Sequence, residues 1–259
     1  MFQAVIVEKE DEIYAVEKSA SASISCFGEF EVRNRTGQPI HWPTQKMEEL
    51  FAYLLCHHGE AISEWRLVDS IWAITDSEQV KQSLHITING LIKMVKEHGL
   101  AIDIQKQSNG YVLETTSKDY DVLAFQRFDL SLLQRESNYD AIEQLCDRYK
   151  GPLLERRNYS WKYPLVRHYG QKYTSLVRHL LQRDMDEQGW QRAERRLYNY
   201  LSMYPLHQEM NLTMLLLYAR SSQLQKMERH FTWFSSLYQM EKGEELPKEI
   251  REWVESYLL

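Results

Sequence analysis

The stretch SEQVKQSLHITINGLIKMVKE, residues 77–97, decides the fold of this chain. Apolar side chains recur along it at helical spacing, which places them on one face; they are Leu84, Ile88, Leu91 and Val95. The opposite face carries Gln82, Ile86, Asn89 and Lys93, with His85 and Lys96 at its edge. The pattern therefore predicts an amphipathic helix with one apolar and one largely polar face.

Short strands and a first helix are predicted ahead of this stretch. Residues 24–32, ISCFGEFEV, read as a strand with a bend at Gly28, and residues 40–42 read as a second strand after a turn. Thr44 is placed to cap a helix over residues 45–57, because its hydroxyl can accept a hydrogen bond from the first turn.

A second short helix and a hairpin complete the outline. Ser63 can cap a helix that runs to Trp72. After the long helix, residues 102–107 and 111–115 alternate as two strands, and Ser-Asn-Gly at 108–110 offers the positive-φ residues of a tight turn. Three helices and a hairpin are typical of a winged helix-turn-helix, whose last helix enters the major groove of DNA. A polar face by itself is more often that of a helix that is simply solvated.

The composition indicates a folded protein rather than a disordered or membrane-spanning one. The chain has 259 residues, 43% of them hydrophobic and 26% charged, which is enough for two domains with apolar cores. No apolar run approaches the roughly 20 residues that cross a bilayer, and the N-terminus lacks the pattern of a signal peptide. Three widely spaced cysteines suggest neither disulfides nor a zinc site. We therefore expect a cytoplasmic protein without a membrane partner.

The distribution of charge argues against tight binding to nucleic acid. The net charge is −6. Residues 1–23 and residues 24–118 each carry −3, whereas residues 119–259 carry 20 basic and 20 acidic side chains. Because phosphate neutralisation by Lys and Arg usually dominates affinity for DNA, a slightly acidic winged helix is expected to bind weakly.

The N-terminal segment, residues 1–23, is predicted to be a short strand followed by a linker. Its opening, MFQAVIVEKEDE, is similar to the start of a response-regulator receiver domain, where a strand leads into acidic residues that help to hold magnesium. A complete receiver does not fit before residue 24. We therefore expect a receiver-like stub, or a lone strand docked on the next domain, and no control by aspartyl phosphorylation.

Residues 24–118 resemble the DNA-binding domain of the bacterial transcriptional activators typified by the antibiotic regulatory proteins. The resemblance rests on FGEFEV, GQPIHWPTQKMEELFAYLLCHHGEAISEWRLVDSIW, LHITINGLIKMV and NGYVLE. It includes Trp42 before the first helix, Lys46 at its start, and Gly110 with Tyr111 in the hairpin. These activators are related to the winged-helix output domains of response regulators, so the resemblance implies a winged helix that binds operator DNA.

The long helix departs from the family at positions that matter for reading bases. The family commonly carries arginines at the positions of Gly90 and Ile92, and only Lys93 keeps a basic character here. Each bidentate arginine–guanine pair contributes roughly 1–3 kcal/mol of base discrimination. Asparagine and glutamine can still read adenine, and isoleucine can meet a thymine methyl group, which favours an A·T-leaning site.

The candidate DNA contacts come from the polar face and edge of the long helix, from the start of the first helix and from the hairpin. The predicted base contacts are Gln82, His85, Ile86, Asn89 and Lys93. The predicted backbone contacts are Lys46, Lys96, Lys106 and Asn109. Each of these residues, taken alone, is also typical of a solvated surface.

The second half, residues 119–259, is predicted to be all helical with a repeat of 34 residues. Leu176, Leu180 and Leu181 pair with Met210, Met214 and Leu215 at this spacing, and the pattern continues through the two following helices. That period is typical of tetratricopeptide-like helical hairpins. A last helix over residues 247–258 is expected to cap the stack.

This half resembles the bacterial transcriptional activator domain that follows the winged helix in the same family. The similar stretches are YKGPLL, EQGWQRAERRLYNYLSMYPLHQEMNLTMLLLYA and LPKEIREWVESYL. The resemblance implies a helical domain that mediates homo-oligomerisation or contact with RNA polymerase or a regulator protein.

No motif of a phosphate-binding, hydrolytic or metal-dependent enzyme is present. The sequence lacks GxxxxGK(S/T), GxGxxG, HExxH and GxSxG. Cys56, His57 and His58 are adjacent, but a metal site needs three or four convergent ligands. We expect no enzyme activity, no cofactor and no metal.

The sequence thus predicts an α+β winged helix-turn-helix followed by an all-α, tetratricopeptide-like domain. The function that it favours is transcriptional regulation through double-stranded DNA. The alternative is a protein-interaction module in which the winged helix has lost specific DNA binding and the helical repeats bind a partner protein.

Overall fold

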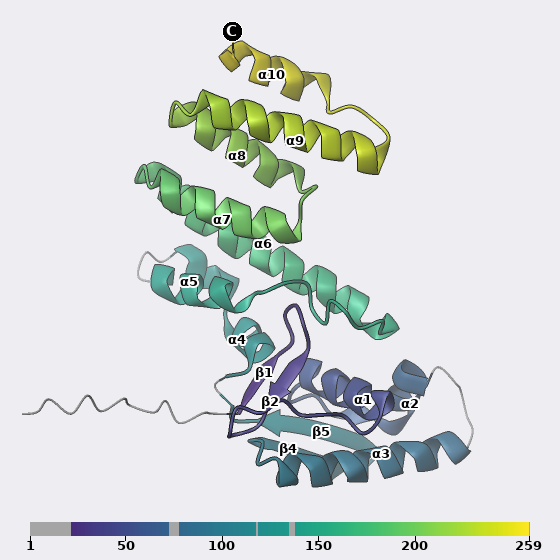
Figure 1. The fold of residues 1–259 in the computed structure, drawn as a ribbon. Helices are drawn as coiled ribbons and strands as arrows, with labels where there is room; N and C mark the ends of the chain where they lie inside the picture. The colour runs from purple at the N-terminus through teal and green to yellow at the C-terminus, as the bar shows by residue number, and fades with distance from the viewer. Residues whose placement is uncertain (1–21, 73–77, 118, 135–137, 259) are drawn as a thin grey trace, which may run out of the picture.

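The computed structural model describes residues 22–72, 78–117, 119–134 and 138–258. The predicted N-terminal strand and its receiver-like acidic cluster lie outside the described residues. Within them the chain is an α+β winged helix followed by an all-α helical domain, as predicted (Figure 1).

The winged helix contains three helices and two small antiparallel sheets. The helices are α1 (Gln45–Cys56), α2 (Glu64–Trp72) and α3 (Glu78–Glu97). One sheet pairs β1 (Ser23–Ser25) with β2 (Glu31–Arg33), and the other has the order β3 (Ile62–Ser63), β5 (Gly110–Thr115), β4 (Ile102–Gln107). The β4–β5 hairpin is the wing that the sequence predicts.

The expected single strand over residues 24–32 is wrong in detail, because the chain reverses inside it. Ser23 pairs with Arg33 and Ser25 with Glu31, so the two ends form an antiparallel hairpin. Gly28 has a φ of +81°, and a Cβ there would lie 3.3 Å from the carbonyl of Lys150. Glycine is therefore favoured both by the backbone conformation and by the close approach of the later segment.

Residues 40–42 form no strand, contrary to expectation. Pro39 makes an isolated bridge to Arg33, and the Ile40 amide donates to the Val32 carbonyl. The segment thus contacts the edge of β2 only at one end before the chain enters α1.

The two predicted helix caps are confirmed. Oγ1 of Thr44 accepts a hydrogen bond from the Met47 amide at 3.2 Å, and Oγ of Ser63 accepts one from the Arg66 amide at 3.2 Å. Each hydroxyl satisfies one of the amides that a helix leaves unpaired at its start.

Gly110 in the wing is required for a reason other than the one that the sequence suggests. Residues 108–110 do not adopt positive φ. Instead β3 passes so close that a Cβ on Gly110 would lie 2.0 Å from the Ile62 carbonyl oxygen. Pairing of Ser63 with Gly110 therefore fastens the wing to the start of α2.

The helical half begins with short elements and continues as stacked pairs of longer helices. Its elements are α4 (Asp121–Arg127), the 3-10 turn η1 (Leu130–Gln134), α5 (Tyr139–Arg148), the 3-10 turn η3 (Ser160–Lys162), α6 (Tyr163–Asp186), α7 (Trp190–Met203), α8 (Gln208–Arg220), α9 (Leu224–Lys242) and α10 (Lys248–Leu258). Figure 1 shows α6 to α9 stacked in order away from the winged helix, with α10 at the far end. The expected helix over residues 119–133 is shorter than predicted, since α4 ends at Arg127.

The 34-residue repeat extends to the backbone of the turns. Gln188 and Ser222 lie 34 positions apart, and both adopt left-handed conformations with φ of 55° and 57°. The amides of Gly189 and Gln223, one residue later, donate to the carbonyls of Asp184 and Tyr218. Equivalent hydrogen bonds thus end α6 and α8 in the same way, which is typical of a structural repeat.

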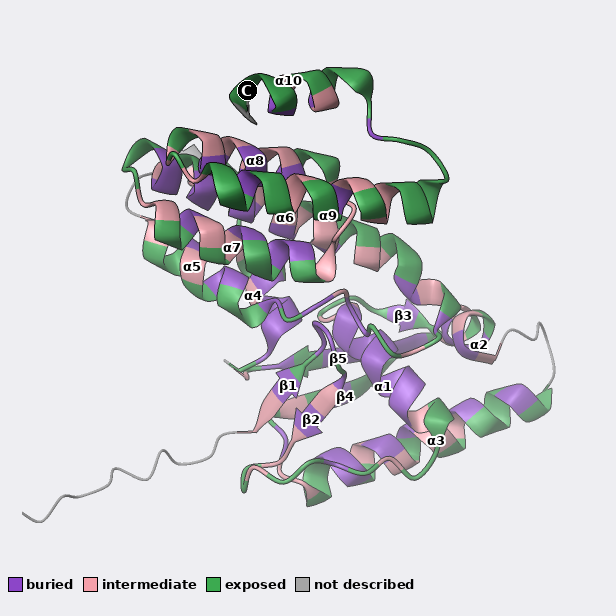
Figure 2. Cartoon of the chain, turned by 45° about the horizontal axis from the view of Figure 1, so that its top comes forward, coloured by how far each residue is buried: buried purple, intermediate pink, exposed green. Residues whose placement is uncertain are grey.

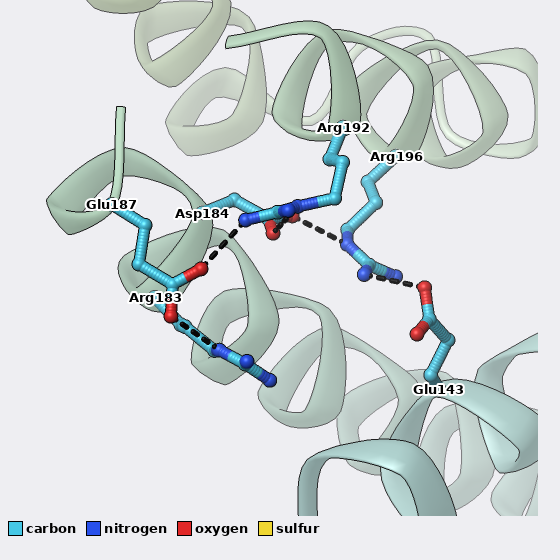
Figure 3. A network of polar contacts seen from close by, with 6 residues as sticks. All are labelled: Glu143, Arg183, Asp184, Glu187, Arg192 and Arg196. Carbon is cyan, nitrogen blue, oxygen red and sulfur yellow. Dashed lines mark hydrogen bonds and ion pairs between the residues drawn. The ribbon is translucent and has the colours of Figure 1, made fainter. Parts of the chain in front are cut away.

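A polar network ties the first helical pair to α5 (Figure 3). Asp184 on α6 is 2% exposed and accepts hydrogen bonds from Arg192 at 2.9 Å and Arg196 at 2.6 Å. Arg196 also reaches Glu143 on α5 at 2.6 Å. The buried carboxylate is therefore compensated by two guanidinium groups, as a buried charge requires.

The two halves share one hydrophobic core. The ring centroid of Phe27, in the winged helix, lies 4.7 Å from the ring centroid of Phe125 and 4.7 Å from that of Tyr149. The buried carboxylate of Asp121, at the start of α4, accepts hydrogen bonds from the amides of Cys26 and Phe27 at 2.7 and 2.8 Å. Buried residues form a continuous cluster from the winged helix into the repeats (Figure 2). The division at residues 118 and 119 stays a prediction.

Candidate nucleic-acid interface

The exposed face of α3 is the candidate interface. Figures 1 and 2 place α3 on the side of the winged helix that faces away from the helical repeats. The apolar face packs inward and consists of Val80, Leu84, Ile88, Leu91, Met94 and Val95. The other face is exposed, as the spacing predicts, and we refer to its side chains as the strip; they are Gln82, Ile86, Asn89 and Lys93.

Ile86 is unusual among these side chains because it is apolar and 73% exposed. A single exposed isoleucine needs no explanation by itself. Its neighbours on the strip, Gln82 and Asn89, are amides that can both donate and accept hydrogen bonds. The strip thus consists of one apolar side chain, two amide side chains and one cation, Lys93.

The two positions where the family resemblance implies arginines are less exposed than the strip, and Gly90 lies toward α1. A Cβ on Gly90 would come 2.8 Å from Cε of Met47, the end of a flexible side chain on α1. Ile92 is partly buried against the core. These two positions therefore flank the strip formed by Gln82, Ile86, Asn89 and Lys93 and are less exposed than it.

A carboxylate at the start of α2 binds two of the predicted DNA contacts. Oε1 of Glu64 lies 3.1 Å from Nε2 of His85 and 3.6 Å from Nζ of Lys106 on the wing. The hydrogen bond with His85 is the main reason why the pKa of Glu64 is lowered from its ordinary value, and Lys106 adds to the effect. Glu64 therefore joins α2 to α3 through a hydrogen bond and to the wing through an ion pair.

The remaining predicted cations differ in how they are paired. Lys93 makes an exposed pair with Glu97 at 3.6 Å. Lys46 binds Glu49 at 3.0 Å and donates to the Ile71 carbonyl at the end of α2. A lysine at a helix C-terminus is stabilised by the helix dipole, so this interaction supports the fold.

Lys96 and Asn109 are exposed. The backbone carbonyl of Asn109 accepts a hydrogen bond from the Glu64 amide at 3.0 Å, which fixes the tip of the wing on α2. The side chain of Asn109 lies at the turn between β4 and β5. These two residues keep the exposure that a phosphate contact requires.

Glu64 is not among the DNA contacts that the sequence predicts. No local pattern indicates its role, because its contacts come from residues 21 and 42 positions later in the chain. Trp65, in the first turn of α2, is 67% exposed. The buried face of α2 is instead formed by Leu67, Val68 and Ile71.

The described residues include no group of three or more His, Cys, Asp and Glu side chains that could hold a metal ion. His57 uses Nδ1 to contact the Tyr53 carbonyl at 2.8 Å, and Nε2 of His58 accepts a hydrogen bond from the Thr115 amide at 3.1 Å. Cys56 is buried beside them. Both histidines thus have structural partners on α1 and β5.

None of the helices formed by the described residues is long and apolar enough to span a membrane.

Comparisons with known proteins identify a similar fold. No family model matches the sequence, and no curated protein matches it. Among solved structures, the chain is similar to Mycobacterium tuberculosis EmbR in complex with a low affinity phosphopeptide, with a TM-score of 0.69 and 13% sequence identity. The match covers 92% of this chain and 65% of the EmbR chain. At this identity the likeness shows the fold, a winged helix followed by a helical domain.

Proposed function

We propose that this chain is a DNA-binding transcriptional regulator of the antibiotic-regulatory-protein type and not an enzyme. In this proposal α3 enters the major groove of double-stranded DNA, and the wing contacts the backbone or the minor groove. The helical repeats mediate homo-oligomerisation or contact with RNA polymerase or a regulator protein. The observation that carries the proposal is the exposed strip of α3, which lies on the outer side of a winged helix.

The chemistry of the strip favours A·T base pairs. Asn89 and Gln82 each present an amide that can bind N6 and N7 of adenine, and Ile86 can contact the methyl group of thymine. Lys93 supplies a cation at the end of the strip, beside Lys96. His85 is the fifth proposed base contact, and it would have to exchange its hydrogen bond with Glu64 for one to a base.

The backbone contacts proposed for Lys96, Lys106 and Asn109 lie on exposed side chains. Lys46 is the weakest member of this set, because it already binds the end of α2. Since Lys93, Lys106 and Lys46 are all close to carboxylates, few cations remain to neutralise phosphate. We therefore expect a single copy to bind DNA weakly and several copies to bind together.

The same pairing of cations favours a second candidate function. A winged helix whose basic groups are neutralised by its own carboxylates can serve as a protein-interaction module, with the helical repeats as the binding surface. This candidate predicts that the chain is not retained on heparin or DNA at low salt, whereas a regulator is retained.

Fluorescence anisotropy tests the proposal with DNA from the chain's own upstream region and a scrambled duplex, at about 50 and 200 mM salt. A regulator binds the upstream duplex more tightly and loses affinity with salt. Replacing Asn89→Ala together with Lys93→Ala is expected to abolish the preference and leave the fold intact.

A matched control removes an amide and a lysine from α9, through Gln239→Ala with Lys242→Ala. Both control positions are exposed and lie far along the chain from α3. If the α3 double variant binds the upstream duplex as wild type does, α3 does not read bases. If wild type binds neither duplex at low salt, the protein-interaction function replaces the proposal.

A further inference from the structure

A groove of about 500 Å³ opens between α7 and α9, with α8 behind it. Its lining includes Tyr198, Leu201, Tyr218, Arg229, His230 and Trp233. We refer to it as the α7–α9 groove. The volume lies in the range of sites that hold small molecules.

Half of the residues that line the α7–α9 groove carry aromatic rings. Tyr198 is 57% exposed and Trp233 is 43% exposed. The rings of Trp233 and His230 lie 5.3 Å apart between centroids, and the Tyr218 ring is 6.3 Å from His230. Exposed aromatic residues around a concave surface are typical of binding sites for flat, apolar groups.

Two polar groups of the groove have no partner among the described residues. Nε2 of His230 is buried and makes no hydrogen bond. Burial also lowers the pKa of His230 to about 4, so the ring is neutral near pH 7. Arg229 is exposed at the groove and makes no ion pair with any residue of the described part of the chain, whereas Lys226 is bound to Glu194 at 2.8 Å.

The preceding repeat provides an internal comparison. His230 lies 34 positions after Arg196, which binds Asp184 and Glu143 and so bridges α7 to α6 and α5 (Figure 3). The groove beside Arg196 measures about 250 Å³. The residue that corresponds to Asp184 in the second repeat is Tyr218, which cannot form such an ion pair. The α7–α9 groove is thus the larger of the two, and it has His230 and Tyr218 where the preceding repeat has the ion-paired Arg196 and Asp184.

We propose that the α7–α9 groove binds a planar aromatic molecule that carries one carboxylate. The ring packs against Tyr198 and Trp233, and the carboxylate binds Arg229, the cation that lacks an acidic partner. Guanidinium and carboxylate groups match in geometry, which favours this class of anion. The binding site is separate from α3 and does not depend on whether α3 reads DNA.

The test measures binding of naphthoate, and of its neutral analogue naphthamide, to the full chain by isothermal titration calorimetry. Arg229→Gln is expected to weaken naphthoate about fivefold, as for an exposed ion pair, and to leave naphthamide unchanged. The matched control is Arg195→Gln, which removes the exposed arginine 34 positions earlier and should have no effect. Trp233→Ala should weaken both ligands while the unfolding midpoint stays close to that of wild type.

Four results would overturn the proposal, and three of them concern naphthoate alone. They are an absence of naphthoate binding to wild type at millimolar concentration, equal binding by wild type and Arg229→Gln, and an equal loss in Arg195→Gln. Equal affinities of wild type for naphthoate and naphthamide would show that the groove does not select an anion. Circular dichroism of each variant excludes misfolding as the cause of a loss.

Discussion

Oε1 of Glu64 lies 3.1 Å from Nε2 of His85, and this contact joins the start of α2 to the edge of the α3 strip. The same oxygen is 3.6 Å from Nζ of Lys106 on the wing. One carboxylate thus contacts two side chains that we expect at the DNA, and it offsets the positive charge of Lys106. An anion between the helix and the wing also repels phosphate, so Glu64 is expected to limit DNA affinity.

Replacing Glu64→Gln should therefore strengthen DNA binding. The variant removes one negative charge from the proposed interface and releases Lys106 toward phosphate. We expect the affinity for both upstream and scrambled duplex to rise severalfold at about 50 mM salt, and the gain to shrink at about 200 mM. Anisotropy titrations at the two salt concentrations measure this effect.

Glu228→Gln is the matched control for Glu64→Gln. Glu228 is exposed on α9, so its replacement makes the same change in net charge away from α3. An equal gain in both variants would show that overall charge, and not the contact with His85 and Lys106, sets the affinity.

Gly90→Ala should stabilise the protein. Gly90 lies inside α3, where glycine costs about 1 kcal/mol relative to alanine. The new methyl group would come within 2.8 Å of Cε of Met47, which is the flexible end of a side chain and can move. We expect the free energy of unfolding to rise by about 0.5 kcal/mol, measured by urea denaturation. DNA binding should not change, because Gly90 is not on the exposed strip.

Asp121→Asn should weaken the junction between the winged helix and the repeats. Both carboxylate oxygens of Asp121 accept backbone hydrogen bonds, Oδ2 from Cys26 and Phe27 and Oδ1 from Val122. An asparagine would direct an amide N–H toward at least one of these donors. We expect a loss of about 2 kcal/mol in the free energy of unfolding.

The difference in stability between wild type and Asp121→Asn should also depend on pH. Burial raises the pKa of Asp121 to about 6 from its ordinary value of 3.8, so the folded state binds the proton more tightly than the unfolded state does. The tighter proton binding adds to the free energy of unfolding of wild type. This added stability is fully present below pH 3.8 and is lost as pH rises through 6. The advantage of wild type over the variant should shrink by about 1.4 kcal/mol between roughly pH 5 and 7.5. A difference that grows over this range would contradict the raised pKa.

Asp184→Asn should destabilise the first helical pair. Asp184 is 2% exposed and is bound by Arg192 and Arg196, so its loss leaves the guanidinium of Arg196 with Glu143 alone. Breaking a buried ion pair costs about 3 kcal/mol. Glu187→Gln is the control, because it removes an exposed partner of Arg192 in the same network and should leave the thermal midpoint unchanged.

The sequence predicts those features of the fold that depend on neighbouring residues. The amphipathic pattern of residues 77–97 and the caps at Thr44 and Ser63 act within one or two helical turns, and the structure confirms them. The repeat of 34 residues is visible because each helical pair uses the same apolar positions. These signals are local or periodic, so no knowledge of the fold is needed to see them.

The features that could not be predicted depend on contacts between distant segments. Gly28 turns the chain inside an apparent strand and lies against Lys150. Gly110 is explained by the approach of β3, not by its own backbone angles. Glu64 enters the candidate site only after α2, α3 and the wing have come together. None of these relationships leaves a pattern in the sequence near the residue concerned.

The shared core around Phe27 has a consequence for how the protein could be divided in an experiment. By position in the chain, Phe27 belongs to the winged helix. Its ring nevertheless packs on Phe125 and Tyr149 of the helical half. A fragment that ends after the wing would present this ring and its neighbours to water and leave the Cys26 and Phe27 amides without their carboxylate. The smallest piece that keeps α3 and the winged helix in their native setting therefore includes α4, α5 and the start of α6.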